Sequence, residues 1–263
     1  DPGAIALSDS GELLLALRAG IARLNPDIES ADITPEIWIA APYDTATTRF
    51  NDGGVDAQGR WWIGSLFAPK THAGAGLYCL ERGELKAILG EQAAQKPWQD
   101  WGVTTANGWA MSPDGTRVYH ADTQAHTVYR YDFSEKLPVE SALSHRQVFV
   151  QTVDTRQQSN PSEPYQGRPD GAVVDSAGNY WGALFEGGQI VQTAPDGTVL
   201  QKIALPAKCP TMPCFGGADL KTLIITTTGD RPVDELAQYP ANGFILSIQL
   251  PVAGLPTRRY RTQ

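Results

Sequence analysis

Short apolar runs alternate along this chain with polar turns rich in Asp, Ser and Gly. Residues 3–7 and 13–17 are two such runs, separated by a Ser-Asp-Ser-Gly-Glu segment. Residues 103–111 and 118–121 are separated in a similar way. Apolar runs of this length, joined by turn-forming residues, are typical of β-hairpins. The pattern therefore predicts an all-β protein built from tight hairpins.

One turn pattern recurs along the chain. Its central glycine stands at positions 11, 59, 115 and 178, and an apolar or aromatic pair and then a small residue follow it. Further turns are expected at 195–197 and at 219–221, the second ahead of the β-branched run 222–228. Spacings of 48, 56 and 63 residues suit one four-stranded blade each, with loops of varying length. The recurrent phase favours a β-propeller over a flat β-sandwich.

Composition and charge limit the class of protein and the partners to be expected. A length of 263 residues fits one β-propeller domain over 1–263, and 41% hydrophobic residues with seven Trp, nine Tyr and seven Phe supply a large core. The net charge is −8 and no Lys/Arg cluster occurs, so nucleic acid is not an expected partner. No apolar stretch reaches the 18 or so residues of a membrane-spanning helix.

The cysteines and the N-terminus bear on the compartment. Cys79, Cys209 and Cys214 are too few for a disulfide framework and lack the spacing of a zinc site. Cys209 and Cys214 can pair if they face each other, but the reduced state is favoured because nothing indicates an oxidising compartment. We expect a cytoplasmic protein. The chain opens at Asp1 without an apolar segment, so a trimmed targeting segment stays open.

Three polar segments stand at equivalent places, each at the start of a predicted blade. They are Arg49-Phe50-Asn51-Asp52-Gly53, Asn107-Gly108-Trp109-Ala110 and Arg168-Pro169-Asp170-Gly171-Ala172. Taken singly, Asn-Gly and Asp-Gly are ordinary turn dipeptides. In a propeller, however, matching positions of different blades converge near the axis. Converging amide and carboxylate oxygens suit a hard divalent cation.

Together these segments resemble the senescence marker protein, regucalcin and gluconolactonase family. The resemblance covers nearly the whole chain and extends through residues 112–115 and 214–217. It implies a six-bladed β-propeller of four-stranded antiparallel blades that hydrolyses sugar lactones. Residues 214–217 and the Tyr239-Pro240 pair look most like bacterial aldonolactonases of pentose and hexose oxidation.

The resemblance also implies roles for four residues. Asn107 and Asp170 look like ligands of one divalent metal, whether calcium, zinc, manganese, magnesium or iron(II). Arg49 and Asn51 look like contacts to substrate hydroxyls or to the lactone. The metal would polarise the lactone carbonyl, and either Asp170 or a hydroxide held by the metal would activate the attacking water. Asp170 is therefore the expected catalytic base.

One departure from the family pattern affects both fold and site. The family's third protein ligand is a Glu in a Glu-Gly-Pro context, and no such segment occurs here. Either some tens of residues are missing ahead of Asp1, or a closed propeller forms with a different first blade. We favour the first and expect an incomplete first blade, with a closing strand from 255–263 if a ring is completed. The histidines show no metal-ligand spacing and are expected on the surface or in strands: His72, His120, His126 and His145.

Two alternatives to a metal-dependent sugar lactonase stay open. A non-catalytic calcium-binding propeller would use the same oxygens for a structural ion, although Arg49 beside a cation would then add only repulsion. A propeller arylesterase of the paraoxonase kind would bring an apolar pocket and a catalytic histidine. A small-molecule sugar lactone is the expected partner, and a monomer or small homo-oligomer is the expected state.

Overall fold

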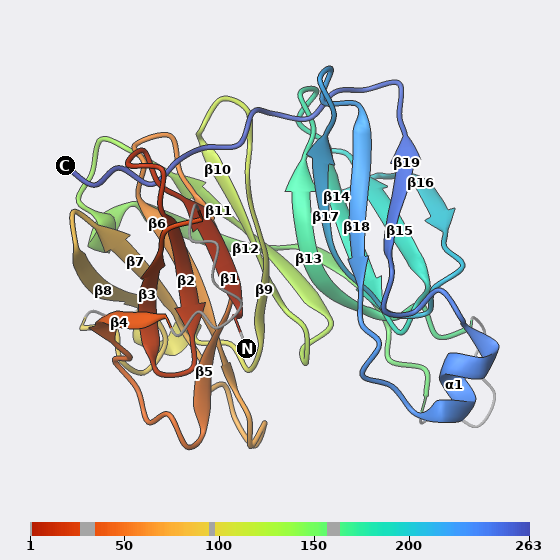
Figure 1. Cartoon of the computed structure of the whole chain (residues 1–263), viewed down its shortest axis with the longest axis horizontal. Helices are drawn as coiled ribbons and strands as arrows, with labels where there is room; N and C mark the ends of the chain where they lie inside the picture. The colour runs from red at the N-terminus through yellow and green to blue at the C-terminus, as the bar shows by residue number, and fades with distance from the viewer. Residues whose placement is uncertain (1, 27–34, 95–97, 157–163) are drawn as a thin grey trace. The chain divides into compact units, whose positions relative to one another are not determined.

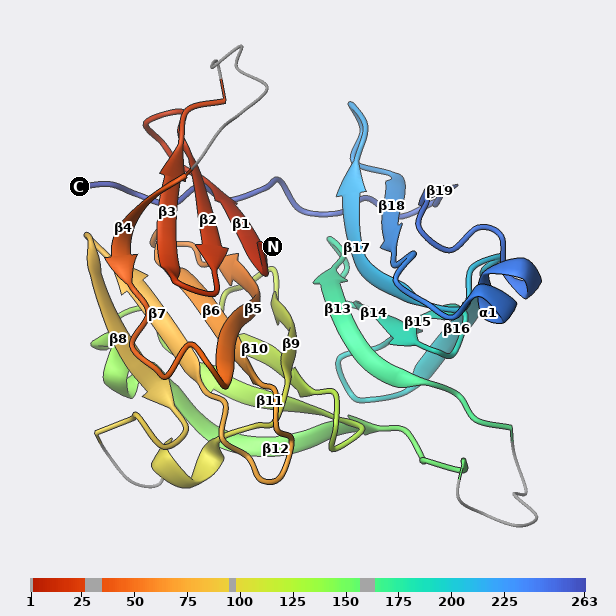
Figure 2. The same cartoon turned by 60° about the horizontal axis from the view of Figure 1, so that its bottom comes forward.

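The computed structural model describes residues 2–26, 35–94, 98–156 and 164–263. Within these ranges, nineteen strands form five sheets, four with four strands and the last with three (Figures 1 and 2). In each sheet the strands are hydrogen-bonded in chain order and pair antiparallel. This meander is the arrangement of a propeller blade.

The strands are best followed by their place in each sheet. The first strands are β1 (Ala4–Leu7), β5 (Thr48–Val55), β9 (Ala106–Met111), β13 (Arg168–Val174) and β17 (Pro210–Gly216). The second strands are β2 (Leu13–Leu17), β6 (Trp61–Phe67), β10 (Arg117–Asp122), β14 (Tyr180–Phe185) and β18 (Thr222–Thr227). The third strands are β3 (Gly20–Leu24), β7 (Leu77–Glu81), β11 (Thr127–Phe133), β15 (Gln189–Thr193) and β19 (Ile245–Gln249). The fourth strands are β4 (Glu36–Ala40), β8 (Glu84–Leu89), β12 (Leu143–Gln151) and β16 (Val199–Ala204).

Helical structure is sparse. One short α-helix, α1 (Val233–Gln238), lies between β18 and β19. Two 3-10 segments, Trp98–Trp101 and Val139–Ser141, lie in loops after β8 and β11. No helix in the described part of the chain is long and apolar enough to cross a membrane.

The all-β, blade-type architecture is confirmed, but the prediction of six blades is wrong. Each sheet opens with a hairpin between its first two strands, and the described residues contain five such hairpins. They hold glycines 11, 59, 115 and 178 and the turn 219–221. The number six came from the family resemblance, whereas the chain's own turns mark five sheets.

The expected gap in the first blade is also wrong. The first sheet, β1 to β4, has all four strands, and the three-stranded sheet is the last one, β17 to β19. The segment 255–263 does not form the expected closing strand. It contributes an isolated parallel bridge between Tyr260 and Ser8, next to the end of β1.

The recurrent turn is held by its first residue. Asp175 accepts hydrogen bonds through Oδ1 from the backbone N–H of Asn179 at 2.9 Å and through Oδ2 from the indole N–H of Trp181 at 2.9 Å. Asp56 accepts from the indole of Trp62 in the same way, at 2.8 Å. Both aspartates are buried. The repeated Asp therefore closes the hairpin and fixes the tryptophan of the following strand.

The chain divides into two compact units. Unit 1 comprises Asp1–Asn107, Phe133–Ser144 and Thr257–Gln263, and unit 2 comprises Gly108–Asp132 and His145–Pro256. The boundary falls inside β9. The expectation of one domain over 1–263 stays a prediction.

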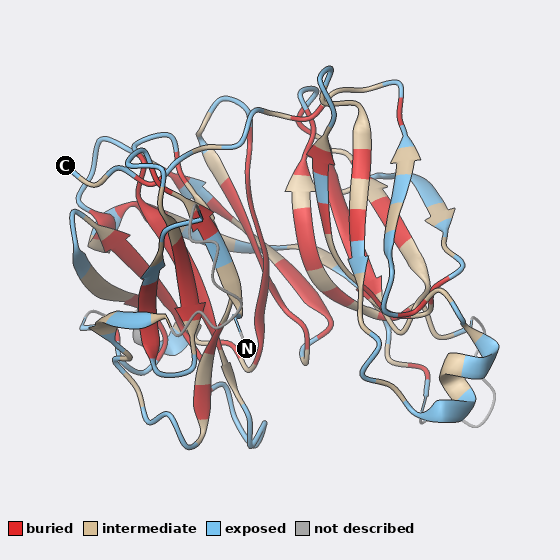
Figure 3. Ribbon diagram, in the orientation of Figure 1, coloured by how far each residue is buried: buried red, intermediate tan, exposed pale blue. Residues whose placement is uncertain are grey.

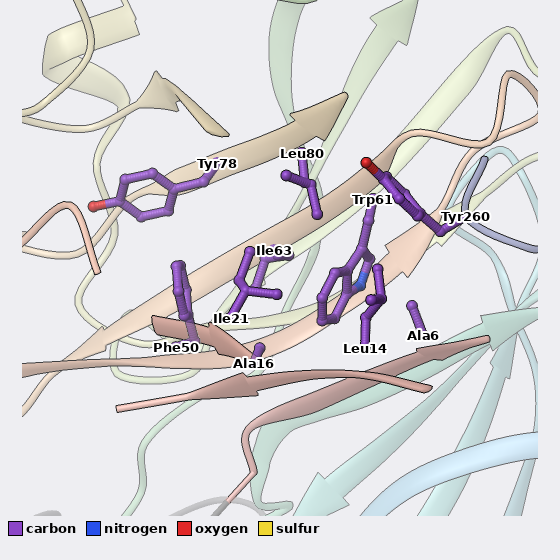
Figure 4. Close-up of a cluster of buried hydrophobic side chains, with 10 residues drawn as sticks. All are labelled: Ala6, Leu14, Ala16, Ile21, Phe50, Trp61, Ile63, Tyr78, Leu80 and Tyr260. Atoms are coloured by element: carbon purple, nitrogen blue, oxygen red, sulfur yellow. The ribbon is translucent and has the colours of Figure 1, made fainter. Parts of the chain in front are cut away.

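Each unit has its own aromatic core. In unit 1, Phe50, Trp61 and Tyr78 are buried together with aliphatic residues of β1 to β3 and with Tyr260 (Figure 4). In unit 2, separate clusters form around Tyr119 and around Trp181. Burial is heaviest on the first three strands of the sheets, while the fourth strands β4 and β16 are largely exposed (Figure 3).

The tryptophans at 61, 62, 109 and 181 are all buried. Cys79, Cys209 and Cys214 form no disulfide with one another. Cys79 and Cys209 are buried, whereas Cys214 is exposed.

Candidate functional site

The four residues to which the sequence assigns site roles all lie on first strands of their sheets. Arg49 and Asn51 are on β5, Asn107 is on β9 and Asp170 is on β13. The first three belong to unit 1 and Asp170 belongs to unit 2. Their equivalent placement is therefore a property of the fold, while their chemical roles stay predictions.

Asn51 and Asp170 occupy the same kind of backbone irregularity. Between residues 50 and 53, three steps along β5 match two steps along β6. The same slip occurs on β13 between residues 169 and 172, and on β17 between residues 210 and 213. An extra residue of this kind is a β-bulge, which re-aims a side chain and is common beside active sites. The bulge is the local feature that distinguishes these positions from ordinary strand residues.

Asn51 and Asn107 meet through their side chains. The Nδ2 of Asn51 donates to the Oδ1 of Asn107 at 2.8 Å and to the carbonyl oxygen of Ala106 at 2.7 Å. Asn107 is buried, with 6% of its surface exposed. The amide of Asn51 therefore fixes the orientation of the Asn107 side chain.

Arg49 lies at the start of β5 and is half-buried. Its Nη1 donates to the carbonyl oxygen of Phe50 at 2.9 Å, which holds the guanidinium against the strand. The ring of Phe50 packs edge-on against Tyr43 and Tyr78, with centroids 5.1 and 5.7 Å away. Burial raises the pKa of Tyr78 to about 12, so this aromatic cluster is uncharged at neutral pH. The strand that carries Arg49 and Asn51 thus packs, through Phe50, against an uncharged aromatic cluster.

The backbone around Asp170 is held from two sides in unit 2. The hydroxyl of Thr123 donates to the carbonyl oxygen of Pro169 at 2.7 Å. Gly108, with φ of +57°, packs so closely that a Cβ there would lie 3.0 Å from the carbonyl oxygen of Asp170. A Cβ on Gly171 would lie 2.7 Å from a backbone oxygen of β17. The glycines of the Asn-Gly and Asp-Gly pairs are therefore required by close strand packing, not by turns.

The donor chemistry of these residues fits a hard divalent cation. Amide and carboxylate oxygens are the protein ligands such ions prefer, and Asn107 and Asp170 supply one of each. Among the residues the structure describes, no group of three or more His, Cys, Asp or Glu side chains is placed to hold a metal. Asn107 belongs to unit 1 and Asp170 to unit 2, so ligation of one metal by both residues stays a prediction.

Sequence reasoning missed an ionic cluster that includes Arg168. Its Nη2 lies 3.1 Å from Oε2 of Glu186, and Arg156 and Arg231 pair with the same carboxylate at 3.1 and 3.2 Å. Glu186 has a φ of +62°, a backbone conformation uncommon outside glycine. These arginines are far apart in sequence and share no motif, so only the proximity of Arg168 to Asp170 in the chain could have drawn attention to them.

The histidines stand mostly where they were expected. His72 and His145 are exposed, and His120 is buried within β10. His126 differs, because it is buried in the turn between β10 and β11. Burial lowers the pKa of His120 to about 3, so this imidazole is neutral at neutral pH.

The antiparallel sheets, with their strands hydrogen-bonded in chain order, define the class of protein as a propeller-type scaffold. Residues 1–229 match the family described as the SMP-30/Gluconolactonase/LRE-like region. The chain belongs to this family, which confirms the resemblance seen in the sequence.

Three similar proteins illustrate the relationship. The chain is 38% identical to a 6-deoxy-6-sulfogluconolactonase of Pseudomonas putida, over 96% of this chain and 78% of that protein. It is 36% identical to a pentonolactonase of Haloferax volcanii, over 69% of this chain and 54% of that protein. A solved structure of regucalcin, a calcium-binding protein of Agrobacterium tumefaciens, matches with a TM-score of 0.79 at 22% identity, over 98% of this chain and 78% of that one. The two named lactonases support the assignment to the lactonase class, and the solved structure supports the fold.

Proposed function

We propose that this protein opens sugar lactones, either aldono-1,4- or aldono-1,5-lactones, to aldonic acids in a metal-dependent reaction. The observation that carries the proposal is the side-chain hydrogen bond between Asn51 and Asn107. It joins a residue that the family resemblance assigns to the substrate with one that it assigns to the metal. The names of the two lactonase relatives support the same reaction class.

Arg49 and Asn51 have different roles toward the substrate in this proposal. The planar guanidinium of Arg49 presents several N–H donors in a fixed geometry, which suits the ring and exocyclic oxygens of a sugar lactone. Asn51 already donates both N–H bonds of its amide to Ala106 and Asn107. Its Oδ1 is then the group that accepts a hydrogen bond from a substrate hydroxyl. Asn51 is thus both a positioning residue for Asn107 and a substrate contact.

Asp170 is the proposed general base. Its carboxylate accepts a proton from water while the water oxygen bonds to the lactone carbonyl carbon. The bond between that carbon and the ring oxygen then breaks, and the ring oxygen takes up a proton to leave as a hydroxyl. A divalent metal held by Asn107 and Asp170 would polarise the carbonyl and stabilise the negative charge that develops on its oxygen.

The test is a hydrolysis assay on a panel of pentono- and hexonolactones and phenyl acetate, each measured above its spontaneous rate. We expect sugar lactones to be opened, chelation to abolish activity, and more than one divalent ion to restore it, because an Asn/Asp oxygen site imposes little selectivity. Full activity in protein shown to be metal-free would contradict the metal dependence. Preference for phenyl acetate would instead indicate an arylesterase, and calcium binding without hydrolysis a non-catalytic protein.

A further inference from the structure

A polar pocket lies in unit 1, at the end of β5 opposite Arg49. Its volume is about 330 Å³, which is within the range of pockets that hold small metabolites. The charged side chains that line it are Arg60, Arg82, Lys136, Arg261, Glu81 and Glu135. They come from the β5–β6 turn, the β7–β8 hairpin, the loop after β11 and the C-terminal segment.

Arg60 is the buried member of this group. Only 4% of the residue is exposed, and its Nε donates to Oδ2 of Asp56 at 2.6 Å. Its guanidinium carbon lies 5.8 and 5.7 Å from the ring centroids of Trp62 and Phe133. Its Nη2 is buried and has no hydrogen-bond partner within the described part of the chain. Buried donors of this kind are normally satisfied, so an acceptor outside the protein is the expected partner.

The charge around the pocket favours an anion. Four basic and two acidic side chains line it, and counting Asp56, which pairs with Arg60, leaves a surplus of one positive charge. The side chains of Arg82, Lys136 and Arg261 form no ion pair with any described residue. The protein as a whole carries a net charge of −8, so the charge of the pocket is opposite in sign to the net charge of the protein.

The pocket is built from turns that are fixed before any ligand arrives. The backbone N–H of Arg261 donates to the carbonyl oxygen of Gly59 at 2.9 Å, and a Cβ on Gly59 would collide with the Arg261 side chain. The hydroxyl of Tyr260 accepts from the backbone N–H of Gly83 at 2.9 Å. The C-terminal segment thus ties the β5–β6 turn to the β7–β8 turn. A preorganised pocket loses less entropy when a ligand binds.

We propose that this pocket binds a small anionic metabolite through a phosphate or carboxylate group. The guanidinium of Arg60, a residue that lines the pocket, donates to an oxygen of the anion, and Arg82, Lys136 and Arg261 supply the surrounding positive charge. The pocket lies outside the lactonase residues, so the proposal does not rest on the proposed function.

The test measures binding of inorganic phosphate by calorimetry, without any lactone present. We expect saturable binding to the wild type and at least tenfold weaker binding to the Arg82→Ala/Lys136→Ala double variant, whose substitutions are at exposed positions. Arg60→Lys keeps the charge but removes the forked donor, and it should weaken binding to a similar extent. Lys70→Ala removes an exposed lysine of unit 1 outside the pocket and should bind phosphate like the wild type.

Two results would overturn the proposal. One is the absence of saturable phosphate binding to the wild type, and the other is wild-type affinity in the double variant. A second arm adds gluconate as a competitor for phosphate. Displacement supports a site that accepts carboxylates as well, while phosphate binding without displacement supports a site restricted to phosphate. The urea unfolding midpoint of each variant serves as the check that it is folded.

Discussion

The side-chain amide of Asn51 donates a 2.8 Å hydrogen bond to the side-chain oxygen of Asn107, a residue 56 positions further along the chain. Asn51 stands in the bulge of β5 and Asn107 on β9, so the bond joins the first strands of two sheets. The same amide also donates to the carbonyl oxygen of Ala106. One side chain therefore satisfies a backbone acceptor and orients a neighbouring functional group.

Removing the Asn51 amide should affect both stability and activity. Asn51→Ala takes a donor from Ala106 and from Asn107, and we expect a loss of about 1–2 kcal/mol in the free energy of unfolding, the scale of lost buried hydrogen bonds. Asn51→Asp should cost more, because a carboxylate would face two acceptor oxygens. Urea unfolding measures the stability and the lactone assay measures the turnover. An Asn51→Asp variant as stable as the wild type would contradict this account.

Substitutions of Asp170 and Arg49 should have different kinetic effects, the first on the chemical step and the second on substrate binding. Asp170→Asn keeps the shape and an oxygen ligand but removes the base and its charge, so kcat should fall by on the order of a hundredfold or more. Arg49→Ala should mainly raise KM, because it removes uniform binding of substrate. Steady-state kinetics with metal present distinguish the two. Near wild-type kcat in metal-loaded Asp170→Asn would exclude Asp170 as the base.

If Arg49 instead contacts the carbonyl oxygen in the transition state, its loss would lower kcat as well. Arg49→Lys is the matched variant, because it keeps the positive charge and removes the planar set of donors. A kcat of Arg49→Lys close to that of the wild type, with a raised KM, supports a role in substrate binding.

A buried turn aspartate should contribute far more to the free energy of unfolding than an exposed turn aspartate. Asp175→Ala leaves the backbone N–H of Asn179 and the indole N–H of Trp181 without an acceptor in a buried turn, so we expect a loss of about 3 kcal/mol or more. Asp196 accepts hydrogen bonds from the backbone and side chain of Thr198, two residues away, in an exposed turn of the same sheet. Asp196→Ala should cost less than about 1 kcal/mol. Equal losses in urea unfolding would show that the repeat has no special structural role.

His120 should make the protein sensitive to mild acid. Burial lowers its pKa in the folded state to about 3, below the ordinary value of 6.5. As the pH falls below 6.5, the unfolded chain binds a proton that the folded chain does not. Stability therefore falls with decreasing pH, by about 1.4 kcal/mol per pH unit from this one group, until the pH approaches 3.

His120→Phe keeps an aromatic ring beside Trp109, whose ring centroid lies 6.5 Å from that of His120. The variant should lose the contribution of His120 to the pH dependence. The measurement is the urea unfolding free energy at pH 7 and at pH 5 for both proteins. A difference between the two proteins that does not change with pH would contradict the assignment.

The sequence determined the local structure of this protein. Turn chemistry acts over four to six residues, so Asp56 and Asp175 mark their hairpins whatever the rest of the chain does. The four turn glycines and the turn at 219–221 accordingly lie where the alternation of polar and apolar residues predicted them. Short sequence motifs of this kind were also sufficient to identify the resemblance to the lactonase family.

The tertiary structure decided what depends on contacts between distant residues. The number of sheets is five, not six, and the three-stranded sheet is the last, because strand pairing and not the family pattern settles which segments join. The sequence predicts Gly108 to be a turn glycine. In the structure, Gly108 instead lies against the backbone of Asp170, because the first strands β9 and β13 pack closely there. Arg60, unremarked in the sequence, gains its importance only from burial between distant segments. Local turns are fixed by neighbours in the chain, whereas the close contact of Gly108 with Asp170 and the burial of Arg60 beside Phe133 arise only when residues 50 or more apart are brought together.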